Sequence, residues 1–209
     1  MSDGEVIQGS DAWRALKAGK ASASRISAVL AKGEGRTRAA YMAELVVERL
    51  TGSFTEGFDN ADMRRGRELE PLARAAYEFT RGVEVELVGF VPHPRIPMAG
   101  ASWDGRVGVP GLVQFKCPTP HVHLEYLDGG TLPKAYRDQI QFELSCDDVL
   151  EWSDFVSFCP AFPEGMDLYR RRISRDQERI REIESEVAAF VAEVDAKVAA
   201  LRARYMEAA

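Results

Sequence analysis

An acidic residue, a glutamine and a lysine are spaced so that together they would suit chemistry on a phosphodiester. Asp104 is followed, after nine intervening residues, by Gln114-Phe115-Lys116 at the end of a predicted strand. Because residues two apart in a strand point to the same face, we expect Gln114 and Lys116 on one face and Phe115 in the core. A hairpin turn at 108–111 would bring Asp104 alongside them. An Asp, a second oxygen ligand and a lysine that orients water or stabilises charge are the parts of a metal-assisted phosphodiesterase.

This segment resembles the D…ExK core of the PD-(D/E)xK nucleases, and its surroundings are similar to the lambda-exonuclease or YqaJ-type viral recombinase family. Four further blocks follow that family's order and approximate spacing from residue 8 to about 160; they are Gly9-Ser-Asp-Ala-Trp13, Ser22-Ala-Ser24, Arg65-Gly-Arg-Glu-Leu-Glu70 and Gln139-Ile-Gln141-Phe142. The core motif alone is weakly specific, whereas the blocks together are specific. The resemblance implies an α/β fold with a restriction-endonuclease-like core, in which helices flank a central mixed β-sheet and a long C-terminal helix follows.

The resemblance also implies a role for each residue of the site. Asp104 matches the carboxylate that bridges metal ions, and Glu70 matches a helix-borne acid that assists the metal directly or through water. Lys116 matches the lysine that positions or activates the nucleophilic water, and Gln139 the glutamine that supports this lysine and the substrate. The main-chain carbonyl of Phe115 matches a further metal ligand. Without the resemblance, each of these side chains has an ordinary alternative as a turn, surface or sheet-edge residue.

Gln114 departs from the family, which has Glu at this position. Glutamine keeps the shape and one acceptor oxygen, but it loses a full negative charge and adds an amide donor. Because a Mg²⁺ site is held chiefly by carboxylates, the change is expected to weaken at least one ion and to favour DNA binding without turnover. Two interpretations are open, natural divergence and an engineered inactivation, and a single isosteric change in an otherwise intact motif favours the second.

Residues outside this motif are candidates for gripping a DNA end. A 5′-phosphate pocket of one basic residue and two hydroxyls is implied at Lys17, Ser24 and Ser102, where relatives carry Arg at the first position. A lysine presents a point charge where arginine offers a two-pronged contact, so a softer phosphate preference is expected. There are three further candidates. Arg36 is a basic contact, Met63 an apolar wedge between the DNA strands, and Trp13 a ring that stacks on a base. For Met63 and Trp13, packing in the core is the alternative. We interpret His121 and His123 as loop residues near DNA.

The elements that must position these residues follow from hydrophobic spacing. Apolar residues at three- and four-residue intervals predict helices, and short β-type runs between Pro and Gly predict a small sheet. The helices are expected at 11–51, 60–79 and 132–144, and the strands at 83–88, 97–102, 112–115, 152–158 and 166–173. Pro71 should kink or restart the second helix, and Ser22 or Ser24 could cap a helix in the first range.

A long amphipathic helix is predicted at the C-terminus, from an apolar seam between Ile180 and Tyr205. Packing on the chain's own sheet and contact with another subunit are both open for it. We expect a single exonuclease domain over 1–209, with N-terminal helices at 11–80, the nuclease core at 83–173 and this helix at 174–207.

Composition is typical of one globular domain: of 209 residues, 45% are hydrophobic and 29% charged. The net charge of −6 lowers the expectation of non-specific nucleic-acid coating, but basic residues cluster locally, at 64–74, 170–175 and 32–38. Cys117, Cys146 and Cys159 form no CxxC pair, which excludes a zinc ribbon and favours core thiols. Neither a secretory leader nor a membrane span is evident, so a cytoplasmic protein without membrane contact is expected.

The resemblance implies a Mg²⁺-dependent 5′→3′ exonuclease that acts on ends of linear double-stranded DNA, releases mononucleotides and leaves a 3′ overhang. It further implies two Mg²⁺ per site with Mn²⁺ as a substitute, a ring-shaped homotrimer, a single-strand annealing partner and a role in phage recombination. The alternatives are a structure-selective endonuclease of the same superfamily and a catalytically silent module that binds DNA ends.

Overall fold

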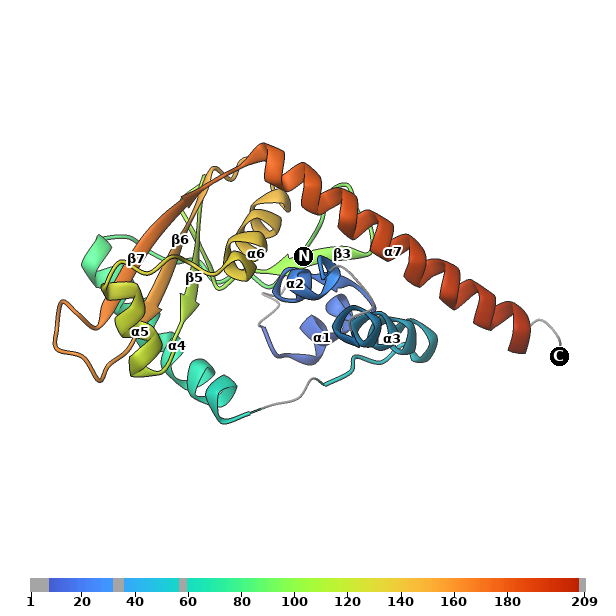
Figure 1. The fold of residues 1–209 in the computed structure, drawn as a ribbon, viewed down its shortest axis with the longest axis horizontal. Coiled ribbons are helices and arrows are strands. Elements are labelled where there is room, and N and C mark those ends of the chain that lie inside the picture. The colour runs from blue at the N-terminus through green and yellow to red at the C-terminus, as the bar shows by residue number, and fades with distance from the viewer. Residues whose placement is uncertain (1–7, 32–35, 57–59, 207–209) are drawn as a thin grey trace, which may run out of the picture.

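Two mixed sheets flanked by helices make up the computed structural model, which describes residues 8–31, 36–56 and 60–206 (Figure 1). The first sheet is small, with the strand order β1-β3-β2. Its strands are β1 (Ala21–Ser22), β2 (Phe90–Pro92) and β3 (Ala99–Ser102). β1 and β3 are parallel, with Ser22 opposite Gly100, whereas β2 and β3 are antiparallel. This sheet joins the N-terminal helices to the rest of the molecule.

The second sheet contains the predicted hairpin and has the order β4-β5-β6-β7. Its strands are β4 (Gly105–Val107), β5 (Gly111–Lys116), β6 (Trp152–Phe158) and β7 (Leu168–Ser174). β5 and β6 are parallel, and the other neighbouring pairs are antiparallel. Gly108 has φ 60° in the β4–β5 turn, a conformation that favours glycine.

Alternation along β5 divides the core into two parts. Val113 and Phe115 face α4 (Ala61–Arg81), where they pack with Ala73 and Tyr77. Leu112 belongs to the larger cluster on the opposite face, which includes residues of α5 (Pro120–Leu127) and α6 (Lys134–Ser145). Because side chains alternate along a strand, Gln114 and Lys116 also face α6. The expected separation of these two side chains from Phe115 is confirmed.

The N-terminal helices are shorter than the single range predicted for them. This segment contains α1 (Asp11–Lys17), the 3₁₀ turn η1 (Ala23–Arg25), α2 (Ile26–Val29) and α3 (Arg36–Thr51). Ser22 precedes η1 but its side chain makes no capping bond there; it contacts the Ser24 hydroxyl instead. The proposed serine cap is therefore wrong.

The longest helix, α7 (Gln177–Tyr205), lies along other helices and not on a sheet (Figure 1). It contacts α2, α3 and α6, and Phe190 stacks on Tyr41 of α3. The predicted seam is buried from Ile180 to Val198, whereas Tyr205 is exposed. Ion pairs from Arg179 to the buried Asp138 of α6 and from Arg38 of α3 to Glu193 hold the helix in place.

Three further predictions differ from the structure. The expected α/β fold with mixed strands flanked by helices and a long C-terminal helix is confirmed, but its strands form two sheets instead of one, because β3 pairs with β1 and β2 while β4 pairs with β5. The predicted strand at 83–88 forms only an isolated bridge between Glu86 and Arg106. α4 does not restart at Pro71 but is one helix that continues to Arg81 and packs on β5 and β6. No helix within the described ranges is both long enough and apolar enough to cross a membrane.

Candidate active site

The β4–β5 hairpin places Asp104 beside the end of β5. Gly105 pairs with Val113, so the residue before it reaches the level of Gln114. The main-chain N–H of Phe115 donates a 2.8 Å hydrogen bond to Asp104 Oδ2. The prediction that the hairpin would return Asp104 to the Gln114–Lys116 face is confirmed.

A buried carboxylate that the sequence analysis missed lies opposite Gln114. Glu143, on α6, is 4% exposed, and Gln114 is 1% exposed. Gln114 Nε2 donates to Glu143 Oε1 at 3.2 Å, and Gln139 Nε2 donates to the same oxygen at 2.8 Å. Gln139 and Glu143 are one helical turn apart. The family-like segment at 139–142 ends one residue before this acid. Their four-residue spacing was the available signal.

Glu70 completes a group of three acids, from the middle of α4. Arg65, on the same helix, donates to the main-chain carbonyl of Cys117 at 3.2 Å, which fixes α4 beside the end of β5. Burial, and then repulsion from Asp104, raise the pKa of Glu70 to about 7. Lys116 and Arg74 act on Glu70 in the opposite direction and lower its pKa.

Lys116 is the cation that all three acids share. Its attraction opposes the upward pKa shift of Asp104, Glu70 and Glu143. Burial is the largest cause of each shift, and it raises the pKa of Glu143 to about 8 with a contribution from Asp104. The Lys116 ammonium also lies 5.3 Å from the centre of the Tyr136 ring of α6. The site therefore holds more carboxylates than its own lysine balances.

These residues fit a hard divalent cation. Gln114 Oε1 is buried and has no hydrogen-bond partner, and such an atom is costly unless something binds it. Carboxylate, amide and main-chain oxygens are the ligands that Mg²⁺ takes. Within the ranges 8–31, 36–56 and 60–206, no three His, Cys, Asp or Glu side chains alone cluster closely enough to hold a metal. A site here would therefore need Gln114 Oε1 or a main-chain carbonyl among its ligands.

Part of the predicted 5′-phosphate pocket comes together at the first sheet. Trp13 Nε1 donates to Ser102 Oγ at 2.8 Å, and the Lys17 ammonium lies 4.5 Å from the centre of the Trp13 ring. Ser24 is exposed in η1, which contacts β3, the strand that ends at Ser102. Burial lowers the pKa of Lys17. Trp13 itself is 8% exposed and packs edge-on against Phe54.

The remaining DNA-binding candidates are more scattered. Arg36 is exposed at the start of α3, and Met63 is 51% exposed in the first turn of α4. Within the described part of the chain, neither side chain forms a hydrogen bond or ion pair with Lys17, Ser24 or Ser102. Lys32, from one basic cluster, lies outside the described residues.

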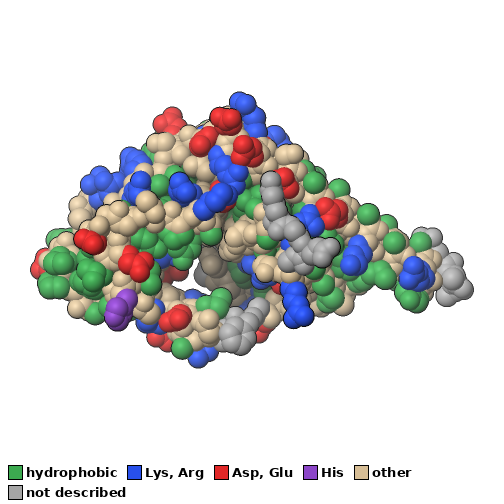
Figure 2. All heavy atoms as spheres, in the orientation of Figure 1, with side chains coloured by type: hydrophobic (Ala, Val, Ile, Leu, Met, Phe, Trp, Pro, Cys, Tyr) green, Lys and Arg blue, Asp and Glu red, His purple; other side chains and the backbone are tan. Residues whose placement is uncertain are grey.

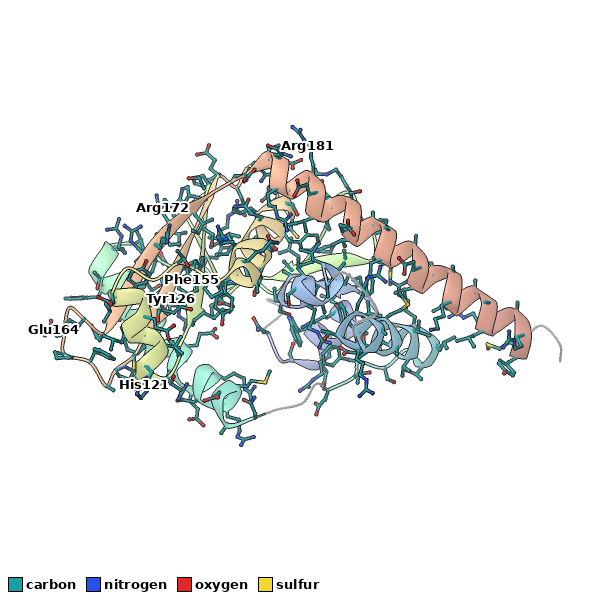
Figure 3. All side chains as sticks on the ribbon, in the orientation of Figure 1. His121, Tyr126, Phe155, Glu164, Arg172 and Arg181 are labelled. Carbon is teal, nitrogen blue, oxygen red and sulfur yellow. The ribbon has the colours of Figure 1, made fainter. Side chains whose placement is uncertain are left out.

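The two histidines are not loop residues, because both belong to α5. His121 is exposed near the start of the helix (Figure 3). His123 is fully buried, and its ring nitrogens contact Ser157 Oγ at 2.7 Å and the Met166 carbonyl at 2.8 Å. Its neighbours are those of a core residue.

Much of the second arginine cluster is structural. Arg170 and Arg172 of β7 bind the fully buried Asp154, which also accepts a 2.8 Å bond from the Tyr77 hydroxyl. Arg172, which is labelled in Figure 3, additionally stacks over the Trp152 ring of β6. Lys and Arg side chains gather over β7, α6 and the start of α7, and a hollow lies beside the carboxyl end of β5 (Figure 2).

Comparison with known proteins gives a consistent result. A family model described as the YqaJ-like viral recombinase domain matches residues 12–149. A solved structure of an alkaline exonuclease (LHK-Exo) from Laribacter hongkongensis is 41% identical; the match covers 96% of this chain and 100% of that one, with a TM-score of 0.88. The same exonuclease in complex with dAMP is 42% identical over the same shares, also with a TM-score of 0.88.

A phage-related exonuclease from Haemophilus somnus 129PT shares the fold at 17% identity; the match covers 90% of this chain and 99% of that one, with a TM-score of 0.69. Comparison with curated proteins gave no match. The family match spans more than half of the chain and contains Asp104, Gln114, Lys116 and Glu143. The chain belongs to the YqaJ-like viral recombinase family.

Proposed function

We propose that this chain is a Mg²⁺-dependent 5′→3′ exonuclease that acts on linear double-stranded DNA, releases mononucleotides and leaves a 3′ overhang. The observation that supports it is the convergence of Asp104, Glu70 and Lys116 at the end of β5, with a buried amide oxygen left unpaired beside them. A nuclease acting on DNA is further supported by the 41% identical relative, an alkaline exonuclease whose structure was also solved with a nucleoside monophosphate.

The metal would be held by four groups, namely Asp104, Gln114, the Phe115 carbonyl and Glu70. We expect two Mg²⁺ ions in the site, for which Mn²⁺ can substitute. When bound, the metal supplies Lewis-acid activation and charge neutralisation at the phosphate. The Phe115 N–H fixes the Asp104 carboxylate in place for this purpose. Lys116 positions the attacking water and stabilises charge at the phosphate. Gln139 supports this lysine and the substrate, and its Nε2 donates to Glu143.

The DNA end is gripped at Lys17, Ser24 and Ser102 through its 5′-phosphate, with Arg36 as a further basic contact. Met63 is exposed at the start of α4, where an apolar side chain would separate the two strands. Trp13 is mostly buried, so its proposed contribution is to hold Ser102 and Lys17 in place. We propose that the DNA end approaches this site through the hollow beside β5 (Figure 2).

The resemblance supports two further proposals about assembly. A ring-shaped homotrimer around DNA would make digestion processive, and a single-strand annealing protein would load on the 3′ overhang during phage recombination. Light scattering of the purified chain, alone and with a tailed duplex, tests the trimer. A monomeric mass in both conditions would contradict it.

The decisive test of function is the release of nucleotides from 5′-phosphorylated linear duplex in Mg²⁺. Duplexes labelled at either the 5′ or the 3′ terminus give the polarity, and covalently closed circular DNA separates exonuclease from endonuclease. We expect the 5′ label to be released first, no cutting of circles, and loss of activity in Lys116→Met but not in Lys197→Met, an exposed lysine of α7.

Two other outcomes would point to the alternatives. Cutting of closed circles would favour the structure-selective endonuclease. Binding of duplex ends without release of nucleotides would favour the silent end-binding module, for which the Gln at position 114 is the supporting feature.

A further inference from the structure

Glu143 differs from two other buried acids, Asp138 and Asp154, in what balances its charge. Asp138 is paired with Lys134 and Arg179, and Asp154 with Arg170 and Arg172. Across the described residues, Glu143 has no ion pair within 4.0 Å, although it is 4% exposed. Buried Glu48 also lacks an ion pair among these residues, but it accepts main-chain N–H bonds from Gly19 and Thr55. The hydrogen-bond partners of Glu143 are the two neutral amides of Gln114 and Gln139, and Lys116 attracts it without forming an ion pair. A buried carboxyl group without a close cationic partner keeps its proton unless a cation binds it.

Gln114 shows the complementary feature. Its Nε2 is used by Glu143, which leaves Oε1 buried and unpartnered on the same amide group. Glu143 therefore accepts a hydrogen bond from the same amide group whose oxygen is unpaired, on the α6 face of β5. Together they offer the oxygen ligands and the single negative charge that one glutamate would have provided.

We propose that Glu143, reaching from α6, supplies the negative charge that position 114 lacks, so that Gln114 and Glu143 together form the second anionic side of the metal site. The inference rests on the proposed metal-dependent function and assigns a metal-site residue on α6 that the motif at 104–116 does not contain. Under this proposal Gln114 belongs to a functional metal site. The other interpretation, that Gln114 inactivates the site, is one of the results that the test can give.

The pairing explains why a glutamine suits position 114. Two carboxylates within hydrogen-bond distance in a buried place repel each other, whereas an amide donates to a carboxylate. Gln114→Glu alone is then expected to add a surplus charge next to Glu143. The exchange Gln114→Glu with Glu143→Gln keeps one acid and one amide, with their positions reversed.

The test measures Mn²⁺ binding to the DNA-free protein by electron paramagnetic resonance, alongside nucleotide release. Relative to the parent chain, we expect Glu143→Gln to weaken Mn²⁺ binding by about tenfold or more. The double exchange should return Mn²⁺ affinity to within about threefold of the parent, which is a small difference on this energy scale. Glu125→Gln, the same chemical change on an exposed residue of α5, is the matched control and should bind as the parent does.

Folding of each variant is checked by thermal melting in EDTA. Glu143→Gln replaces a buried acid by a neutral amide of the same shape, so above about pH 8, where the acid would ionise, its melting temperature should equal or exceed that of the parent. If Glu143→Gln binds Mn²⁺ as the parent does, or if the exchange binds as weakly as Glu143→Gln, the inference is overturned. It is also overturned if Gln114→Glu alone is the variant with the greatest metal affinity and activity, because Gln114 would then be an inactivating change.

Failure of the proposed function gives a different pattern. In that case the parent chain neither binds Mn²⁺ nor releases nucleotides, and the role of Glu143 fails with it. A parent that binds Mn²⁺ and cleaves DNA, with Glu143→Gln indistinguishable from it, overturns only the inference about Glu143.

Discussion

The main-chain N–H of Phe115 donates a 2.8 Å hydrogen bond to Asp104 Oδ2, so the strand that carries the glutamine and lysine also holds the aspartate. Asp104→Asn keeps the side-chain shape and an oxygen that can accept this bond, but it removes the charge. Nucleotide release should fall by at least about 100-fold, because metal-assisted charge stabilisation contributes several kcal/mol. Thermal melting should change little; a large drop in melting temperature would show a structural role instead.

Lys116 lowers the pKa of every acid in the site, so its removal should alter the pH profile as well as the rate. In Lys116→Met, the pKa values of Asp104, Glu70 and Glu143 rise further, because the attraction that opposed their shifts is lost. The acidic limb of the pH–rate profile should then move to higher pH, with a rate loss of about 100-fold or more. Lys116→Arg keeps the charge and should leave the limb in place; equal shifts in both variants would contradict this explanation.

Much of the hairpin could be predicted from sequence because its signals are local. Alternation of Gln114, Phe115 and Lys116 assigns their faces, and the glycines at 108 and 111 permit the return to Asp104. The position of Glu70 required the resemblance, since nothing in the helical pattern of α4 distinguishes its site-facing acid. Alternation also predicted a strand at 83–88, but a strand needs a partner along its length, and only Glu86 finds one.

The four-residue spacing of Gln139 and Glu143 puts both side chains on one face of a helix, but it does not say what that face contacts. The role of Glu143 depends on α6 packing against the face of β5 that contains Gln114, which is a tertiary contact between residues 29 apart in the chain. The division into two sheets could not be predicted for the same reason. It depends on the pairing of Ala99 with Ala21, two residues that lie far apart in the chain.

Metal-free protein should lose stability as the pH rises. The pKa of Glu143 is about 8 in the fold, against 4.5 for the free side chain, so the folded state retains a proton that the unfolded chain has released. This contribution is fully present below about pH 4.5 and is lost as the pH rises through about 8. The expected loss, from denaturant unfolding in EDTA at a series of pH values, is on the order of a few kcal/mol.

Two controls identify the source of this slope. Glu143→Gln has no proton to lose at this position and should flatten the dependence, leaving the smaller part that Glu70 contributes in the same direction. Mg²⁺ should also flatten it in the parent chain, because a bound cation favours the ionised acids. A stability that rises with pH in EDTA would contradict the prediction.

Lys17 is expected to determine the preference for phosphorylated ends. Its ammonium lies over the Trp13 ring, whose N–H holds Ser102, so one cation and one hydroxyl are fixed by the same indole. Lys17→Ala should lower the initial rate on 5′-phosphorylated duplex to that on 5′-hydroxyl duplex, a loss of about tenfold for one charge-assisted contact. Lys20→Ala removes a nearby lysine that donates to the Leu16 carbonyl and should preserve the preference. Lys17→Arg should strengthen it, because a guanidinium binds phosphate through two donors. If Lys17→Ala slowed both duplexes equally, Lys17 would act on the fold or on DNA binding in general and not on the end phosphate.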